Sequence, residues 1–248
     1  MFDYSVSDYL LGGGFFLGAV LYTSVGHAGA SAYIAVMSLF GLNAATIKPT
    51  ALSLNILVSS YTSVQYIKAK LYDLKLAIPL LIGAIPMAFL GGKINLPGEI
   101  YKPIVGVIVL YSAYRFITVK PYVEQTPKVY NKLSAVAVGA VIGFLSGLTG
   151  TGGGIFLSPL ILFARWTTVK GASGTAAIFI LFNSISGLLG NISSVKNLPE
   201  ALPLYIVFVL MGSFVGTRLG IYHFAHVGVK RALGVVLLIA GLKLTFNL

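Results

Sequence analysis

The pattern of apolar and polar residues along the chain predicts membrane-spanning helices. A helix needs about 20 residues to cross a bilayer, and three apolar runs in each half approach that length. In the first half they cover residues 47–66, 74–91 and 101–117. In the second half they cover residues 171–190, 201–216 and 229–246. Polar residues gather between these runs, which is typical of a protein that crosses the membrane several times.

Two further apolar runs, residues 10–40 and 133–163, are too long for one ordinary span. A glycine-rich stretch interrupts each near its middle, at residues 26–31 and 147–154. Because glycine frees the backbone for turns, each run is expected to be either a re-entrant hairpin of two half-helices or a broken span followed by a surface helix. The chain is therefore predicted to be all-α, with about eight hydrophobic segments in the membrane.

The two halves align on each other, which indicates an internal duplication. At a shift of about 125 residues several positions coincide, and a small slip continues the match further along. The matched pairs are Gly18 with Gly143, Gly29 with Gly154, Thr50 with Thr175, Gly91 with Gly216, Lys93 with Arg218, Lys102 with Lys230, and Gly106 with Gly234. Chance similarity between apolar helices is the alternative. The repeated order favours two homologous transmembrane repeats, residues 1–125 and 126–248, within one membrane domain.

Composition supports this interpretation. Hydrophobic residues make up 57% of the 248 positions and charged residues only 9%, whereas a soluble domain carries roughly a quarter charged residues. The net charge is +11, but the basic residues flank apolar runs, so no nucleic-acid partner is expected. The sequence contains no cysteine, and nothing in it predicts a cofactor or a metal site.

The distribution of lysine and arginine discriminates between the two topologies. If each long run returns to the side it came from, one side carries 12 of the 17 basic residues. The other side then carries only five, namely Lys48, Lys93, Lys102, Lys196 and Lys243. The positive-inside bias favours this arrangement, with both termini outside and three crossings per half. The two repeats would then be inverted relative to each other.

The two glycine-rich breaks are the predicted substrate site. Irregular backbone at membrane depth persists only where protein buries it or water reaches it, and a half-helix that starts there offers unpaired N–H groups suited to an anion. Close helix packing through small residues is the alternative role of these glycines. The candidate substrate-binding residues are Ser24, Gly26, His27, Gly29, Ser31, Asn55, Thr149, Gly150, Thr151, Gly152, Gly153, Gly154, Thr175 and Asn183.

Three of these side chains have two readings each. His27 lies inside an apolar run, where an ionisable group is costly, and it can either contact an anion or carry a coupled proton. A neutral histidine that satisfies backbone carbonyls is the other reading. Asn55 and Asn183 lie in matching helices and can either bind an oxyanion or join neighbouring helices.

Other charged residues have simpler roles. Lys93 and Arg218 end matching spans, where they can anchor the helix at the interface or attract anions to a vestibule. The six acidic residues all lie near loops or the N-terminus, and no paired carboxylates or phosphate-binding loop are present. An enzyme is therefore not predicted, and a cation site is disfavoured.

Three motifs resemble the TauE/SafE family of sulfite exporters. They are Gly18-x-x-x-x-Thr23-Ser24-Val25-Gly26, then Gly143-x-x-Ser146-Gly147-Leu148-x-Gly150-x-Gly152-Gly153-Gly154 followed by Pro159, and a third from Gly174-Thr175 to Asn183-Ser184-x-Ser186-Gly187. The resemblance runs from about Gly13 to Leu244, and the first half departs from the pattern at His27-Ala28-Gly29. It implies secondary transport of small anions, often sulfur-containing ones such as sulfite or sulfonates.

The resulting expectation is a multi-pass transporter of a prokaryotic inner membrane that exports sulfite or an organosulfonate by alternating access around the paired breaks. Its partners are the anion and the lipid bilayer, with proton coupling through His27 and a homodimer left open. An anion channel is the alternative, followed by an intramembrane enzyme that uses His27, against which the lack of an acidic partner counts.

Overall fold

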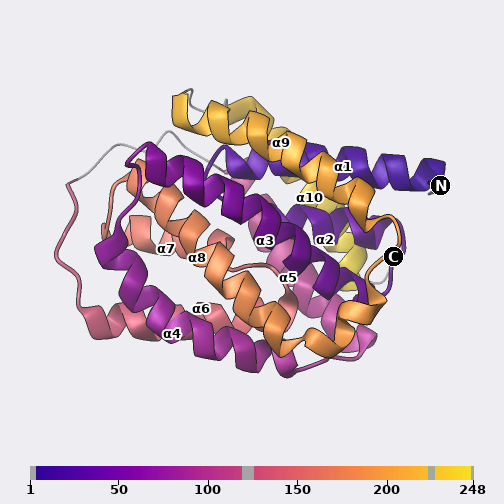
Figure 1. Cartoon of the computed structure of the whole chain (residues 1–248), viewed down its shortest axis with the longest axis horizontal. Coiled ribbons are helices and arrows are strands. Elements are labelled where there is room, and N and C mark those ends of the chain that lie inside the picture. Colours follow the sequence, from indigo (N-terminus) through magenta and orange to yellow (C-terminus); the bar gives the residue numbers. More distant parts are fainter. Residues whose placement is uncertain (1–3, 119–125, 223–226, 247–248) are drawn as a thin grey trace.

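The computed structural model describes residues 4–118, 126–222 and 227–246, which form helices and turns without a strand (Figure 1). The predicted boundary between the halves, at residue 125, adjoins the part that is not described. The first half contains α1 (Val6–Thr23), α2 (Ala30–Leu39), α3 (Ala44–Lys68), α4 (Leu74–Lys93) and α5 (Gly98–Ile117). The second contains α6 (Lys132–Thr149), α7 (Gly154–Phe163), α8 (Val169–Gly190), the 3₁₀ helix η1 (Ile192–Asn197), α9 (Leu202–Tyr222) and α10 (Val227–Phe246).

Five of the described helices, α1, α4, α6, α8 and α9, are long and apolar enough to cross a membrane. Three of them, α4, α8 and α9, match predicted spans. The other two, α1 and α6, are the first parts of the broken runs and have 18 residues each, so they are not the half-helices that the sequence suggested. Their partners α2 and α7 have 10 residues each.

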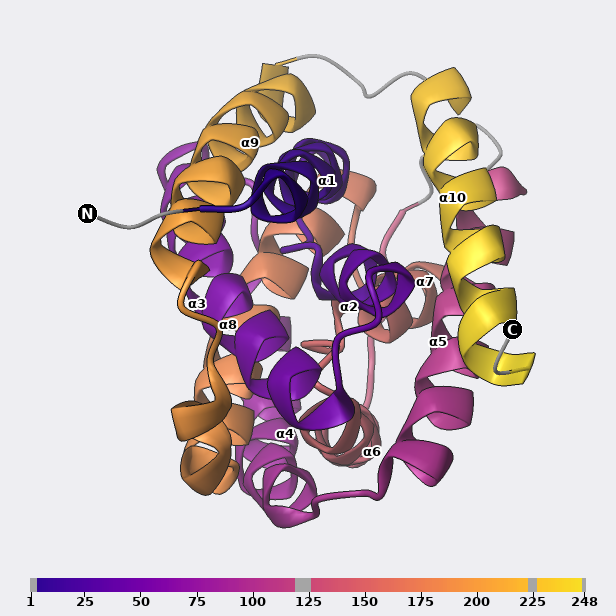
Figure 2. The ribbon, with the colours of Figure 1, turned by 90° about the vertical axis from the view of Figure 1, so that its right-hand side faces the viewer.

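The first broken run folds back on itself. Along α1 and α2, Gly14 lies against Val36 and Gly18 against Ala32, so the two helices are antiparallel. Most residues of α2 are buried, including Tyr33 and Ile34 at 0% exposure, because α2 packs inside the helices around it (Figure 2). Of the two arrangements expected for this run, a surface helix is therefore wrong.

The second broken run also returns toward its start. The backbone N–H of Lys128, just before α6, donates to the carbonyl of Arg165, just after α7, at 2.7 Å. Five residues of α7 are buried, among them Leu157 and Ile161, so this helix is not a surface helix either. Each glycine-rich break thus joins a long helix to a short one that returns toward the start of the long helix.

Glycines allow the two halves to pack closely. In α6, Gly139 and Gly147 lie against the backbone carbonyls of Leu80 and Ala88 in α4, so α4 and α6 run parallel. In the matching place, Gly212 and Gly220 of α9 lie against the carbonyls of Phe16 and Ser24 in α1. Small residues at a regular spacing let helix backbones approach in a bilayer, where apolar side chains gain little by leaving lipid.

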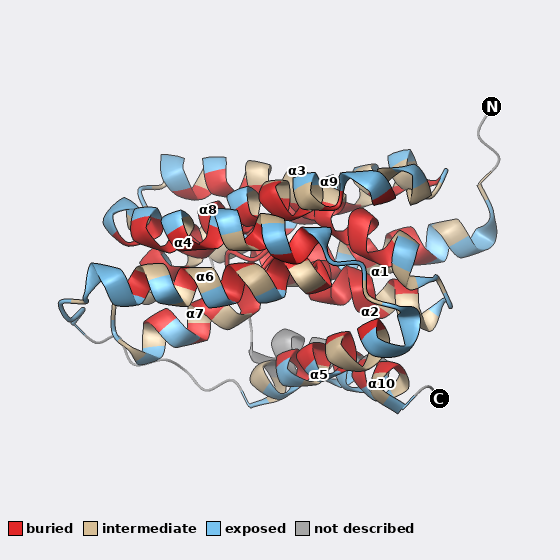
Figure 3. Cartoon of the chain, turned by 90° about the horizontal axis from the view of Figure 1, so that it is seen from below, coloured by how far each residue is buried: buried red, intermediate tan, exposed pale blue. Residues whose placement is uncertain are grey.

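The helices α3 and α8 pack against each other in the interior, and α5 pairs with α10 along one side (Figures 2 and 3). Cations of this second pair contact the ends of the short helices. The ammonium of Lys243 donates to the carbonyl of Leu39 at 3.0 Å, and the guanidinium of Arg115 lies 5.7 Å from the ring centre of Phe163. Each half therefore holds the end of the other half's short helix.

Candidate anion site at the two breaks

The first break owes its shape to two glycines in the left-handed region. Gly26 has φ 80°, which turns the chain at the end of α1, and the N–H of His27 then donates to the carbonyl of Tyr22 at 2.9 Å. Gly29 has φ 107° and precedes α2, where the Tyr33 hydroxyl donates to the carbonyl of Ala28. Glycine adopts this conformation without the strain that a Cβ would cause.

The second break uses three glycines in the same way. Gly150, Gly152 and Gly153 have φ values of 83°, 75° and 82°. The N–H of Gly150 donates to the carbonyl of Ser146 at 2.7 Å and ends α6, while Gly153 precedes α7. The consecutive glycines that the sequence singled out are therefore required by the backbone itself.

The two breaks meet inside the protein. The Nε2 atom of His27 lies 2.7 Å from the hydroxyl oxygen of Ser158, one turn into α7. The His27 ring also approaches Gly154, since a Cβ there would be 3.2 Å from the His27 Cδ2 atom and would collide with Ile180. Ser158 was not among the predicted site residues, because only the fold brings this serine next to a histidine from the other half.

The two predicted asparagines lie next to the second break. The Nδ2 atom of Asn183 donates to the carbonyl of Gly152 at 3.3 Å, and that of Asn55 donates to the hydroxyl of Ser184 at 3.4 Å. Their side-chain carbonyl oxygens accept no hydrogen bond from any described residue. Both asparagines are almost fully buried, at 1% exposure for Asn55 and 0% for Asn183. An unsatisfied buried amide is costly, which marks this place as one where a ligand or water can bind.

We call His27, Asn55, Gly152, Gly154, Ser158, Asn183 and Ser184 the break cluster. Six of these seven residues are buried, His27 among them at 8% exposure, and Ser158 is half-buried. Both short helices begin beside a break without a side-chain cap, α2 after Gly29 and α7 after Gly153. Their first N–H groups carry partial positive charge, which favours a small anion over a cation.

The hydroxyl groups of the other predicted residues bond outside this cluster. The Ser24 hydroxyl donates to the Leu21 carbonyl, and the Ser31 hydroxyl donates to the Tyr22 hydroxyl at 2.9 Å. Thr149 and Thr151 share a hydroxyl contact of 3.1 Å beside Gly150. Thr175 lies away from the cluster: its hydroxyl accepts from the N–H of Asp73 at 3.0 Å and fixes the start of α4.

The two predicted vestibule cations are exposed and contact rings of their own helices. The ammonium of Lys93 lies 4.7 Å from the ring centre of Phe89, and the guanidinium of Arg218 lies 4.1 Å from that of Phe214. The two pairs occupy matching places in α4 and α9. Neither cation is among the residues of the break cluster.

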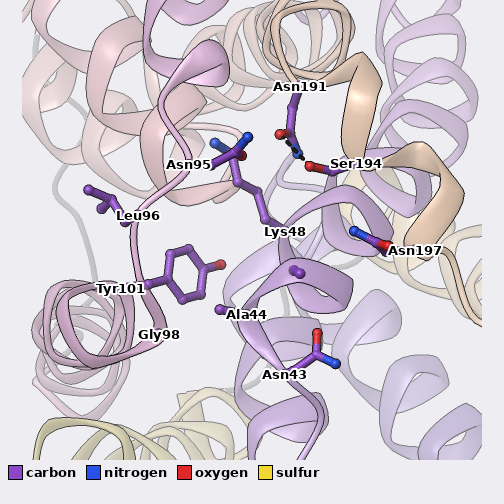
Figure 4. Close-up of a pocket in the computed structure, with 11 residues that line it drawn as sticks. Asn43, Ala44, Lys48, Asn95, Leu96, Gly98, Tyr101, Asn191, Ser194 and Asn197 are labelled. Atoms are coloured by element: carbon purple, nitrogen blue, oxygen red, sulfur yellow. Dashed lines mark hydrogen bonds between the residues drawn. The ribbon is translucent and has the colours of Figure 1, made fainter.

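A pocket of about 450 Å³ lies elsewhere, at the starts of α3 and α5 and the end of α8 (Figure 4). Among its lining residues are Lys48, Tyr101 and Asn191, which the sequence did not single out as site residues. Lys48 is only 4% exposed, although a lysine near the start of a span normally reaches water. No group of three His, Cys, Asp or Glu side chains suited to a metal was found among the described residues.

The five long apolar helices define a multi-pass membrane protein with a polar cluster in its interior. A family model described as "Sulfite exporter TauE/SafE" matches residues 10–244, so the chain belongs to the TauE/SafE family. Over 234 residues it is 38% identical to "Probable membrane transporter protein y4hK" of Sinorhizobium fredii, covering 93% of this chain and 95% of the relative. A "Probable membrane transporter protein" of Haemophilus influenzae is 34% identical over 100 residues, 40% of this chain and 38% of the relative. No solved structure matches.

Proposed function

We propose that this chain exports a small sulfur-containing anion, sulfite or an organosulfonate, across a prokaryotic inner membrane. The anion would bind in the break cluster. The observation that carries the proposal is the contact between His27 and Ser158, which brings the breaks of both halves to one place. The sulfite substrate is supported by the description of the family.

The chemistry of the cluster suits an oxyanion. The uncapped starts of α2 and α7 supply partial positive charge, while the lack of a side chain at Gly152 lets the Asn55 amide pack directly on the backbone of the break. The orphan amide oxygens of Asn55 and Asn183 need a donor. A protonated oxyanion such as hydrogensulfite has both an oxygen for the N–H groups and a hydroxyl for these amides.

Alternating access is the proposed mechanism. The largely buried cluster corresponds to an occluded conformation, and opening toward either side requires a short helix to move away from the interior. We take the halves, residues 1–125 and 126–248, to be inverted repeats. The opposite directions of the matching helices α3 and α8 support this, because Leu52 lies near Gly187 while Asn55 donates to Ser184, so the two helices are antiparallel. This mechanism is compatible with proton coupling through His27 and with a homodimer. It is also compatible with Lys93 and Arg218 attracting the anion to a vestibule.

The test is transport of ³⁵S-labelled sulfite by the purified protein in liposomes, with and without a pH gradient. Sulfate, methanesulfonate and acetate serve as competitors. Saturable flux that methanesulfonate inhibits more strongly than acetate is expected, together with loss of flux in the double variant Asn55→Leu, Asn183→Leu. Flux that rises linearly with sulfite and follows voltage alone would instead identify a channel, and no flux of any anion would remove the substrate claim.

A further inference from the structure

The pocket at the starts of α3 and α5 contains a buried cation without a carboxylate among its lining residues. The ammonium of Lys48 donates to the carbonyls of Gly92 at 3.0 Å and Ile94 at 2.9 Å, at the end of α4. An ammonium has three protons, so one remains for the pocket that Lys48 lines. Glu99, which follows the lining residue Gly98 in sequence, is exposed and does not line the pocket.

A second buried group in the same pocket lacks a partner. Asn191 is 1% exposed, and its side-chain oxygen accepts from the Ser194 hydroxyl at 2.9 Å. Its Nδ2 group donates to no described residue. In Figure 4 the Asn191 side chain points toward Lys48 and Asn95. Two donors, one charged and one neutral, therefore converge on a space whose ligand has to accept hydrogen bonds.

Helix ends add to this preference. Ala44 and Ala45 form the first turn of α3 and Gly98 begins α5, and all three line the pocket. The first N–H groups of a helix have no partner within it and carry partial positive charge. The lining therefore combines one full positive charge with two positive helix ends and the amides of Asn43, Asn95 and Asn197.

The pocket adjoins the second break. The Tyr101 hydroxyl donates to the carbonyl of Thr149 at 2.9 Å, and a Cβ at Gly150 would lie 3.2 Å from Cγ of Lys48. An anion in the pocket would therefore be separated from the break cluster by the backbone of the break itself. The start of α3 and the end of α8, which contribute to the pocket lining, lie at the same end of the protein as the start of α1 (Figure 1).

We infer that this Lys48 pocket is a second anion-binding site, separate from the break cluster, which binds small oxyanions at one end of the transport path. The inference rests on the proposed function for the role of the site in transport, but binding to the pocket can be measured without transport. The alternative is that Lys48 only stabilises the end of α4 by donating to its carbonyls. In that case no anion would bind in the pocket.

The natural absence of cysteine allows a local probe. Ala45 lines the pocket and is exposed, so the Ala45→Cys protein can be labelled with bimane in detergent and titrated with sulfate, sulfite and methanesulfonate at constant ionic strength. We expect a saturable change in fluorescence. Lys48→Met in the labelled protein should raise the half-saturating concentration about tenfold or more, because a charged donor is lost.

Two further variants separate anion binding from folding. Asn191→Asp keeps the side-chain shape but places a carboxylate beside the anion, and it should weaken binding about as strongly as the loss of Lys48. Lys75→Met removes an exposed lysine at the opposite end of α4 and should leave binding unchanged. No saturable response in the labelled protein, or equal half-saturation in all four proteins, would overturn the inference.

Sulfite flux in liposomes, measured in parallel, distinguishes the two claims. Saturable flux without any anion response at the pocket overturns this inference and leaves the proposed function standing. An anion response that depends on Lys48, without flux, supports the pocket and removes the transport claim.

Discussion

The imidazole Nε2 of His27 and the hydroxyl of Ser158, 2.7 Å apart, connect the first break of the chain to the short helix that follows the second. Both side chains belong to segments that fold back inside the protein. Because His27 is 8% exposed and Ser158 lies beside it, movement of either short helix has to break or carry this contact. This hydrogen bond therefore has to break or move when the protein changes between occluded and open conformations.

Replacing His27 is expected to impair transport. His27→Ala removes the contact with Ser158 and should lower sulfite flux about tenfold, since one hydrogen bond to a buried group contributes about 1–2 kcal/mol. If His27 also carries a coupled proton, His27→Gln should retain part of the flux but lose its dependence on a pH gradient. Liposome flux at several pH gradients measures both effects.

Ser158→Ala and Ser60→Ala form a matched pair for this prediction. Ser60 bonds only to the Ile56 carbonyl within its own helix, so its loss should leave flux unchanged. Ser158→Ala should lower flux, though less than His27→Ala. Unchanged flux and unchanged pH dependence in His27→Ala would remove any role for the histidine.

The glycines of the second break can be tested against one in an open loop. Gly152 and Gly41 both have positive φ, 75° and 77°, but only at Gly152 would a Cβ collide with Asn55. Gly41→Ala should cost about 1 kcal/mol from backbone strain alone. Gly152→Ala adds the cost of overpacking, about 1–3 kcal/mol more. Thermal unfolding in detergent reports the difference, and equal losses in both variants would contradict the close packing of Asn55 on the break.

Packing between the halves is tested by two glycines that lie near each other, Gly147 in α6 and Gly187 in α8. A Cβ at Gly147 would collide with the carbonyl of Ala88, whereas at Gly187 its nearest contact would be 3.4 Å away. Gly147→Ala should therefore destabilise the protein by about 1–3 kcal/mol. Gly187→Ala should be nearly neutral, because it fits without movement and alanine favours the helix. If both variants unfold at the same temperature, close contact between α4 and α6 at Gly147 is contradicted.

The sequence predicted the helices well where apolar runs end at charged residues. The run at residues 74–91 became α4 (Leu74–Lys93), with Asp73 accepting from the N–H of Leu76 at its start. The breaks were also visible, because consecutive glycines have few other uses in an apolar run. The full length of α1 and α6 could not be predicted from the sequence, because the position of a glycine break does not indicate how many helical residues precede or follow it.

The partners of buried polar groups were not predictable. Lys48 was expected to be one of the lysines that flank a span. It is buried instead, because its ammonium donates to the carbonyls of Gly92 and Ile94 at the end of another helix. Tyr66, Tyr101 and Tyr205 lie near the ends of apolar runs, where aromatic side chains of membrane proteins often face the interface. Their side chains are instead 1–2% exposed, since neighbouring helices cover them. Such contacts join residues far apart in sequence, and a single sequence carries no signal for them.

The topology can be tested at two matching helix starts. Asn43 caps α3 by accepting from the N–H of Thr46, and Thr168 caps α8 by accepting from that of Gly171. Inverted repeats place these caps on opposite sides of the membrane. In the naturally cysteine-free chain, Asn43→Cys and Thr168→Cys each lose one cap, at a similar cost of about 1 kcal/mol, so the two variants are matched in stability. A membrane-impermeant maleimide added to intact cells should label Asn43→Cys and reach Thr168→Cys only after the membrane is opened, as expected if the termini lie outside. The reverse pattern would keep the inverted repeats but turn the protein over in the membrane, and equal labelling of both variants in intact cells would exclude inversion.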